Sequence, residues 1–446
     1  MKSILILGAG MSSSTLIKYL LSNAKEYDWF VRVVDQDIEL VKSKINNHER
    51  GEALSFDALD SSERRIRIKK SDLVISMLPA RYHVAVAQDC IDLKVNLITP
   101  SYISKEMENL DDAAKKAGII IMNEIGVDPG IDHMSAMKII HDIQRKKGEL
   151  LSFKSFCGGL IAPAYDTNPW HYKFTWNPRN VVLAGQGGLA CFIEKNEYKY
   201  LPYNRLFKKI DRIKIEKFGV FEGYANRDAL RYRKTYGIDT IPTIYRGTLR
   251  RPNFCQGWDV FIELGMTDDQ TIMTNTHLLT PRTFLNAFLP YKSRISVEEK
   301  FKLFLRPERA YLFEQFEWLG LFKSDINFEL TEASPAKLLE ELLIKKLSLE
   351  AGDKDMLVMY HQFKYVLNGK KYKVESSMVN LGMDQQFTSM SNTVGLPIAI
   401  AAKMILTGNL QEKGVTLPIK KEVYEPILNE LKNYGIEFNE SEKIIN

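Results

Sequence analysis

Cysteine is scarce in this 446-residue sequence, and its four copies, Cys90, Cys157, Cys191 and Cys255, lie far apart. No C-x-x-C pair occurs, and no histidine stands at the spacing of a metal ligand. This pattern excludes a disulfide framework and gives no sign of a zinc site, so we predict no metal. It is typical of a reducing compartment, and we expect a cytoplasmic protein.

Runs of like charge and apolar runs of membrane-spanning length are also missing. The 61 basic and 56 acidic residues give a net charge of +5, and five like charges never stand together. So small an excess does not predict nucleic-acid binding, although it suits small anionic ligands. The apolar stretch from Gly395 to Leu406 contains Lys403 and is shorter than the roughly 20 residues that cross a bilayer. We therefore expect a soluble protein without membrane partners.

The first 124 residues alternate short apolar runs with longer amphipathic segments. The apolar runs lie at residues 4–7, 31–34, 73–78, 95–99 and 119–122. Strands that alternate with helices predict a doubly wound parallel sheet with right-handed crossovers. We therefore predict an α/β fold with a Rossmann domain over residues 1–124.

The rest of the chain changes character in stages. After the first 150 residues it is richer in aromatic residues and arginine, and runs such as 258–264 favour strands. Between residues 281 and 349 apolar residues recur at helical spacing, and Ser334-Pro335 predicts a helix start. We expect an α+β substrate domain over 125–280 and 350–388 with a helical insertion over 281–349. The last part, 389–446, is expected to be helical, with one helix beginning at Pro397, and to pack back on the Rossmann domain.

A glycine turn, Gly8-Ala9-Gly10-Met11-Ser12-Ser13, stands between the first predicted strand and helix. Gly8 permits a tight turn, and Gly10 lets a pyrophosphate approach the backbone, where the helix N-terminus offers free N–H donors. Ser13 keeps the third position of the motif small enough for close packing of helix and strand. The alternative is a turn that only joins strand to helix, and Asp35 at the end of the second strand favours the dinucleotide interpretation.

Asp35 also bears on the choice of cofactor. A carboxylate at this position accepts hydrogen bonds from the ribose diol of NAD and repels the 2′-phosphate of NADP. Gln36, the next residue, offers no cation in compensation. The sequence therefore favours NAD over NADP, and the alternative is that Asp35 is only a solvent-facing residue at a strand end.

Later strand ends should border the same crevice. Met77 and Leu78 end one predicted strand, and Ser101 and Tyr102 follow another, so they are candidates to line the nicotinamide side. Further on, a Pro-Gly turn within residues 123–133 can aim Asp128 into the crevice. The alternative is that Asp128 or the nearby Asp132 caps the next helix. His133 is expected to be structural.

The second domain offers four short segments as candidates for a ligand site. Phe156–Leu160 contains Cys157 and two glycines, which expose the backbone, and cations and hydroxyl groups come from Tyr172–Trp176, Asn226–Asp228 and Arg246–Arg251. Arginine in a glycine-containing turn such as Arg246–Arg251 suits bidentate capture of a carboxylate. The alternative for Arg250 and Arg251 is that both side chains lie on a solvent-exposed face and bind no ligand.

Taken in order, these motifs resemble the saccharopine dehydrogenase family, in particular its glutamate-forming branch. The resemblance extends to Thr393–Pro397 and Tyr424–Leu428 near the end of the chain. It implies a Rossmann domain, a substrate domain and a helical insertion. It also implies an NAD(P)-dependent oxidoreductase of lysine metabolism that acts on CH–NH groups and interconverts saccharopine with L-glutamate and L-2-aminoadipate 6-semialdehyde through an imine.

The resemblance further implies which positions form the site. Substrate contacts fall on Ser101, Tyr102, Asp128, Arg227 and Thr248. The cofactor is expected to contact Gly8, Gly10, Met11, Ser12, Ser13, Asp35, Met77, Leu78, Glu124 and Trp176, and Cys157 and Trp176 lie beside the reacting centre. The candidate catalytic groups, which would exchange a proton with the substrate, are Asp128, Tyr102 and Cys157. Fungal members carry an arginine-containing turn in place of Asp35-Gln36, and Ser and Tyr in place of Ala229 and Arg251.

Two other functions are compatible with such a fold. A carboxynorspermidine-type polyamine imine reductase would share the cofactor domain, but a polyamine needs acidic and aromatic groups where this chain has arginines. A non-catalytic nucleotide-binding scaffold is the other alternative, because fold alone does not fix function. The expected partners are small-molecule substrates and, in a homodimer, a second copy of the chain.

Overall fold

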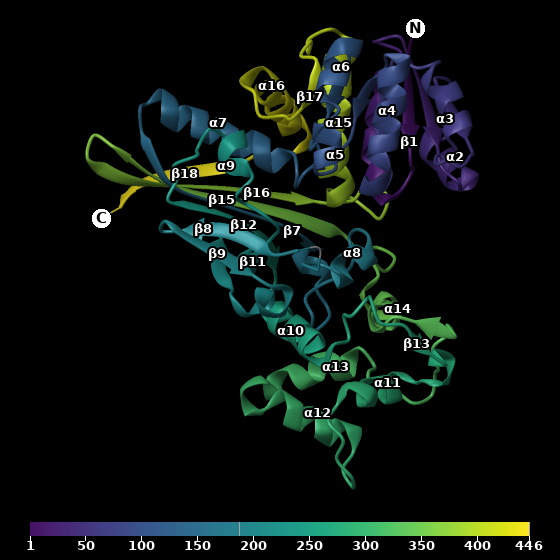
Figure 1. Ribbon diagram of the computed structural model, residues 1–446, viewed down its shortest axis with the longest axis vertical. Coiled ribbons are helices and arrows are strands. Elements are labelled where there is room, and N and C mark those ends of the chain that lie inside the picture. The colour runs from purple at the N-terminus through teal and green to yellow at the C-terminus, as the bar shows by residue number, and fades with distance from the viewer. Residues whose placement is uncertain (187, 446) are drawn as a thin grey trace. The chain divides into compact units, whose positions relative to one another are not determined.

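The protein is described by a computed structural model that covers residues 1–186 and 188–445 (Figure 1). Its chain forms two compact units. Unit 1 contains residues 1–150 and 365–446, and unit 2 contains residues 151–364. Each unit has its own sheet strands and its own buried core.

Unit 1 is built on a parallel sheet of seven strands, β17-β6-β5-β4-β1-β2-β3. Every pairing within it is parallel. The strands are β1 (Lys2–Leu7), β2 (Trp29–Val34), β3 (Gly51–Leu54), β4 (Leu73–Ser76), β5 (Asn96–Ile98), β6 (Ile120–Met122) and β17 (Gly414–Thr416). The order from β3 to β6 is that of a Rossmann sheet, which confirms the predicted fold. The apolar run at residues 4–7 is fully buried, as strands covered on both faces require.

Helices connect these strands. They are α1 (Ser14–Asn23), α2 (Ile38–Ile45), α3 (Ser61–Ile68), α4 (His83–Leu93), α5 (Lys105–Glu108) and α6 (Asp111–Ala117). Helix α2 begins after Asp37, whose carboxylate accepts hydrogen bonds from the backbone N–H groups of Glu39 and Leu40. Helix α4 contributes Val86, Ala87 and Cys90 to the core beneath the sheet.

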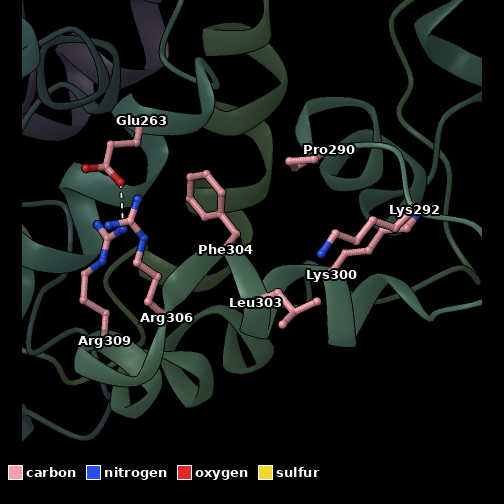
Figure 2. A pocket seen from close by; sticks show the side chains of 8 residues that line it. All are labelled: Glu263, Pro290, Lys292, Lys300, Leu303, Phe304, Arg306 and Arg309. Carbon is pink, nitrogen blue, oxygen red and sulfur yellow. Dashed lines mark hydrogen bonds and ion pairs between the residues drawn. The ribbon is translucent and has the colours of Figure 1, made fainter.

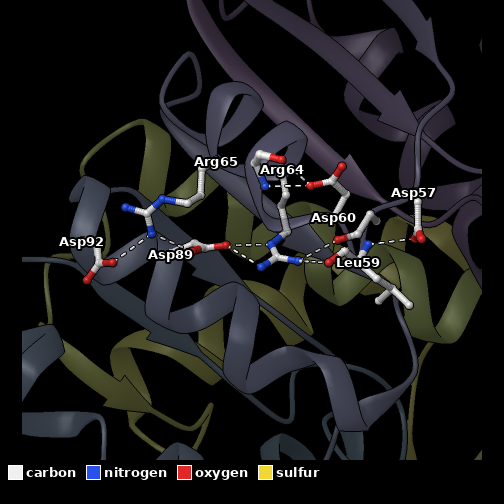
Figure 3. A network of polar contacts seen from close by, with 9 residues as sticks. Asp57, Leu59, Asp60, Arg64, Arg65, Asp89 and Asp92 are labelled. Carbon is white, nitrogen blue, oxygen red and sulfur yellow. Dashed lines mark hydrogen bonds and ion pairs between the residues drawn. The ribbon is translucent and has the colours of Figure 1, made fainter.

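A buried ion pair holds α3 against α4 (Figure 3). Arg64 Nη2 lies 2.6 Å from Asp89 Oδ2, and both residues are 5% exposed. The second oxygen of Asp89 lies 2.7 Å from Arg65 Nη1, which also pairs with Asp92 at 2.9 Å. Arg64 donates a further hydrogen bond to the carbonyl of Ala58. The guanidinium of Arg64 is therefore compensated inside the protein, as a buried charge must be.

The C-terminal part of unit 1 contains α15 (Ser389–Leu406), α16 (Lys421–Leu431), β16 (Lys370–Leu381) and β18 (Asn439–Ile445), and α7 (Ile131–Arg145) follows the first sheet. Helix α15 packs on α1, and a Cβ added at Gly395 would lie 2.7 Å from the backbone nitrogen of Leu16. Among the described helices, α15 is the one long and apolar enough to span a membrane, and most of it is buried. Packing against α1 therefore accounts for its apolar character.

The prediction that a helix begins at Pro397 is wrong. Helix α15 begins eight residues earlier, where the Thr388 side chain accepts a hydrogen bond from the N–H of Ser391. Pro397 stands inside the helix and is buried. A proline inside a helix removes one hydrogen bond, and here the burial of the helix around it outweighs that loss.

Unit 2 contains the strand order β10-β11-β12-β7-β15, with β8 paired to β12 and β9 paired to β8. The bounds are β7 (Glu149–Ile161), β8 (Ala190–Glu194), β9 (Glu197–Leu201), β10 (Asp211–Ile215), β11 (Gly219–Ala225), β12 (Thr243–Arg250) and β15 (Asp355–Leu367). Strands β7 and β12 are parallel, whereas β12, β11 and β10 run antiparallel. Two short helices, α8 (Pro178–Val182) and α9 (Tyr232–Thr235), lie between these strands in the chain.

The prediction of a strand over residues 258–264 is wrong, because this run forms most of α10 (Phe254–Leu264). Phe254, Trp258 and Phe261 recur at helical spacing and are buried. Phe254 stacks on Trp258 at 5.1 Å, and Phe261 stacks on Trp170 at 5.5 Å. A continuous apolar run fits a buried helix as well as a strand, and these aromatic contacts select the helix.

The helical insertion of unit 2 contains α11 (Pro281–Phe288), α12 (Val297–Leu305), α13 (Phe313–Trp318) and α14 (Pro335–Leu347), with the two-stranded pair β13 (Met273–Thr274) and β14 (Glu332–Ala333). Phe301 and Phe316 pack edge to face at its centre. Ser334 caps α14 by accepting the N–H of Lys337, and Pro335 is its first residue, which confirms the prediction for this helix start.

Candidate active site

The glycine turn lies where β1 ends. Gly8 has φ +100°, and a Cβ there would lie 3.2 Å from the carbonyl carbon of Met77, so packing against the end of β4 requires glycine. A Cβ at Gly10 would meet no atom within 4 Å. The protein's own packing therefore does not explain Gly10, whereas the approach of a ligand to the backbone does. Residues Met11–Ser13 form a 3-10 turn before α1, and no described side chain caps its N-terminus.

Asp35 and a lysine flank this turn. Asp35 Oδ2 accepts a 2.7 Å hydrogen bond from the N–H of Ala9, so its carboxylate faces the turn and not the solvent alone. Lys44, from α2, donates 2.6 Å to the carbonyl of Gly10 and 3.1 Å to Ser13 Oγ. Burial lowers the pKa of Lys44 to about 8, and the nearby charge of Asp35 opposes this shift.

These groups fit a dinucleotide. An exposed glycine backbone and uncapped N–H groups at a helix start suit a pyrophosphate, and a carboxylate after the second strand suits a ribose diol. The sequence interpretation found this set except for Lys44. Nothing in the sequence distinguishes Lys44 from Lys42, which is exposed and pairs with Glu39.

A buried histidine connects two strand ends of the parallel sheet. His83, at the start of α4, lies 2.9 Å from Ser76 Oγ through Nδ1, and its Nε2 lies 2.8 Å from Ser101 Oγ and 2.9 Å from Thr99 Oγ1. It is 3% exposed, and burial lowers its pKa to about 4, so the ring is neutral at neutral pH. His83 therefore fixes the hydroxyl of Ser101, a predicted substrate contact. The sequence interpretation missed this histidine.

Tyr102 and Asp128, two of the three candidate catalytic residues, are in contact. The hydroxyl of Tyr102 donates a 2.8 Å hydrogen bond to Asp128 Oδ1, and both side chains are partly exposed. Asp128 does not cap α7, whose N-cap is Gly130 without a side-chain cap. Asp132 accepts the N–H of Gly130 at 2.6 Å. The capping alternative is therefore wrong for Asp128.

Glu124 lies deeper in the same unit. It is fully buried with φ +54°, and its carboxylate accepts the N–H of Ile103 at 2.9 Å and lies 2.7 Å from Nε2 of His133. The backbone N–H of Glu124 donates to the carbonyl of Ser101 at 3.2 Å. His133 is thus part of a buried pair, as expected of a structural histidine. A contact of Glu124 with the cofactor stays a prediction. The hydrogen bond from its backbone N–H places Glu124 next to Ser101.

Unit 2 carries the other predicted residues. Cys157 on β7 and Thr248 on β12 are partners in the parallel register, so the two are neighbours across the sheet. Arg227 follows β11, is exposed and has φ +52°, and its carbonyl accepts the N–H of Cys191. Trp176 is half-buried just before α8. The structure therefore brings Cys157 and Thr248 together and places Arg227 on a loop after the same group of strands.

The pair Arg250-Arg251 is not a solvated face. Arg250 is 3% exposed and lies over the rings of Tyr172 at 5.1 Å and Phe254 at 5.2 Å. Arg251 is partly buried and donates to the carbonyl of Phe218. Aromatic faces stabilise both guanidinium groups, so this alternative of the sequence interpretation is wrong.

A surface cavity of about 250 Å³ lies in the helical insertion (Figure 2). Arg309 at its edge donates to Glu263 at 2.7 Å, and Arg306, Lys292 and Lys300 also line it. None of the predicted site residues lines this cavity. It adds no group that the predicted reaction requires.

Comparisons with known proteins agree along the whole chain. The family model of the saccharopine dehydrogenase NADP binding domain matches residues 4–122, and that of the saccharopine dehydrogenase C-terminal domain matches residues 126–436. Saccharopine dehydrogenase (NADP(+), L-glutamate-forming) of Schizosaccharomyces pombe is 31% identical over 459 residues, which is 99% of each chain. The solved structure of an apo saccharopine dehydrogenase (L-Glu forming) from Saccharomyces cerevisiae has a TM-score of 0.89 at 31% identity. It covers 99% of this chain and 100% of that one.

A longer relative matches over part of its length. The mitochondrial alpha-aminoadipic semialdehyde synthase of Rattus norvegicus is 34% identical over 464 residues. The match covers 98% of this chain and 47% of that protein.

Proposed function

We propose that this chain, which belongs to the saccharopine dehydrogenase family, interconverts saccharopine with L-glutamate and L-2-aminoadipate 6-semialdehyde. The observation that carries the proposal is the match to the S. pombe enzyme over 99% of both chains. The paired Tyr102 and Asp128, of which Tyr102 follows Ser101 in the sequence, supply polar groups that such a substrate needs. The chain is then an oxidoreductase that acts on a CH–NH group.

The cofactor is a nicotinamide dinucleotide, and it supplies or accepts the hydride when bound. The backbone of Gly10 and the N–H groups at Met11 and Ser12 would hold its pyrophosphate, and Asp35 would accept the ribose hydroxyls. Because Asp35 already faces the turn, NAD is favoured as the preferred cofactor. The named relative uses NADP(+), so a comparison of kcat/KM with NAD and NADP tests this point directly. Clear preference for NADP would overturn it.

The protein's part in the reaction is placement and proton transfer. Arg227 and Thr248 bind substrate carboxylates. The guanidinium of Arg227 suits this role better than an ammonium does, because it can donate to both carboxylate oxygens at once. Asp128 holds the substrate amine through a charge-assisted hydrogen bond. Tyr102, which donates a hydrogen bond to Asp128, passes a proton to or from the substrate nitrogen, and Cys157 is the third candidate for this role.

The test is a substrate panel with the purified full chain. Nicotinamide absorbance should change with saccharopine in one direction and with glutamate plus the semialdehyde in the other. Turnover of a carboxylated polyamine in their place would favour the polyamine reductase. Cofactor binding without turnover of any of these would favour the scaffold. A cytoplasmic location and a homodimer stay predictions, and sedimentation of the purified protein tests the dimer.

A further inference from the structure

We propose that Lys44 is a cofactor-specificity residue, whose ammonium lets the ribose end of the site accept the 2′-phosphate of NADP(H) beside Asp35. The inference rests on the proposed function only in that the cofactor is a nicotinamide dinucleotide, and it concerns the ability to bind NADP(H) at all, which is compatible with a preference for NAD. Asp35 alone would repel a 2′-phosphate, and Gln36 offers no charge against this repulsion. The structure supplies the missing cation from α2, where Lys44 stands nine residues after Asp35.

The contacts of Lys44 place its charge at the glycine turn. Its Nζ lies 2.6 Å from the carbonyl of Gly10 and 3.1 Å from Ser13 Oγ. Gly10 is the residue whose bare backbone faces open space, and Ala9 beside it donates to Asp35. The ammonium and the carboxylate therefore both contact the glycine turn, at the neighbouring residues Gly10 and Ala9.

Three other cations of the same unit already have partners. Lys42 pairs with Glu39 on the helix itself, and Arg32 on β2 pairs with Glu52 on β3 at 2.8 Å. On α1, Lys18 lies 4.3 Å from the centre of the Phe387 ring.

Lys44 differs from these cations. It makes no ion pair among the described residues, and its hydrogen-bond acceptors, the carbonyl of Gly10 and Ser13 Oγ, are neutral. Burial also lowers its pKa to about 8 although the nearby charge of Asp35 opposes this shift, so the ammonium is only partly compensated. An incoming phosphate dianion would add to this compensation.

A purely structural role for Lys44 makes a different prediction. If the residue only holds the glycine turn in shape, its loss must affect NADH and NADPH alike, because both place the same pyrophosphate against the turn. If it supplies charge to the 2′-phosphate, its loss must affect NADPH far more, because the two cofactors differ in that group alone.

The experiment measures the dissociation constants of NADH and NADPH by fluorescence titration of the full chain. Lys44→Met should weaken NADPH about tenfold or more, as loss of one charge-assisted contact predicts, and leave NADH within about threefold. Lys44→Arg keeps the positive charge and should bind NADPH about as tightly as the wild-type protein does. Lys42→Met, on the same helix but exposed, is the matched control and should change neither constant.

Three outcomes would overturn the inference. These are equal weakening of both cofactors by Lys44→Met, unchanged binding of both, and a wild-type protein that binds NADH but not NADPH. The titration requires no turnover, so an enzyme that binds both cofactors but does not oxidise saccharopine would refute the proposed reaction and not the role of Lys44.

Discussion

The side chains of Tyr102 and Asp128 come from segments 26 residues apart and meet through one 2.8 Å hydrogen bond. In this pair, the Tyr102 hydroxyl can donate a proton and the Asp128 carboxylate can bind a cationic amine. Such pairs are common where a proton must move during reaction. The two residues are therefore the first targets for substitution.

Replacing Asp128 by Asn should lower kcat/KM for saccharopine roughly a hundredfold or more, because the amide neither balances an ammonium nor accepts a proton. Tyr102→Phe keeps the ring, removes the donor, and should act mainly on kcat. Steady-state kinetics measure both effects, and titration of NADH, which should be unchanged, is the control. Full activity of Asp128→Asn would remove Asp128 from the mechanism.

Arg227 is expected to bind a substrate carboxylate. Arg227→Ala should raise KM for saccharopine about tenfold or more, because a charge-assisted hydrogen bond present in ground state and transition state alike is lost. Arg212→Ala, at an exposed position on β10, is the control and should leave KM unchanged. An unaltered KM in Arg227→Ala would show that Arg227 does not bind a substrate carboxylate.

His83 predicts a specific dependence of stability on pH. Its pKa is about 4 in the folded protein and near 6.5 when unfolded, so between these values the unfolded chain binds the extra proton. The contribution of His83 to stability is complete above pH 6.5 and is lost as pH falls toward 4, a change on the order of 3 kcal/mol.

Chemical unfolding of wild type and His83→Gln at several pH values measures this effect. Glutamine does not titrate, so the stability difference between the two proteins should shrink as pH falls through this range. A difference that stays constant with pH would contradict a neutral, buried His83.

At the scale of elements, docking of α3 on α4 depends on one buried charge pair. Asp89→Asn leaves the guanidinium of Arg64 buried without a counter-charge, and should lower the free energy of unfolding by about 3 kcal/mol or more. Urea unfolding measures the loss. Asp92→Asn, on the same helix at an exposed pair with Arg65, should cost far less.

A double variant shows whether the loss of stability comes from the missing ion pair or from the charge left without a partner. Arg64→Met with Asp89→Leu removes both ions, so it should be markedly less destabilised than Asp89→Asn, because no charge is left unpaired. If the double variant is less stable than Asp89→Asn, the attraction within the ion pair, and not the cost of an uncompensated charge, determines how much this contact stabilises the protein.

For the whole molecule, the glycine turn links cofactor binding to stability. A ligand that binds only the folded protein stabilises it by about 2.7 kcal/mol at one hundred times its dissociation constant. NADH should therefore raise the unfolding temperature of the wild-type chain.

Gly10→Val should remove this thermal shift. A Cβ at Gly10 meets no protein atom within 4 Å and the backbone there has a φ of −63°, so the variant without ligand should unfold as wild type does. Differential scanning calorimetry with and without NADH compares the two proteins. A full thermal shift in Gly10→Val would place the pyrophosphate elsewhere.

The sequence by itself determined the features that depend on neighbouring residues. Short apolar runs that alternate with amphipathic segments predicted the parallel sheet, and Ser334-Pro335 predicted the start of α14, because period, capping and φ are local properties. It did not determine α10, because an apolar run of 258–264 suits either element until aromatic partners are known.

Only the tertiary structure decided which distant side chains meet. Strand order brings Ser76, His83 and Ser101 into one hydrogen-bonded group, and the packing of α2 beside α1 carries Lys44 to Gly10. These contacts join elements that are separated along the chain, so no local pattern encodes them. The sequence specified the glycine turn, and the packing of helices on the sheet determined the charges around it.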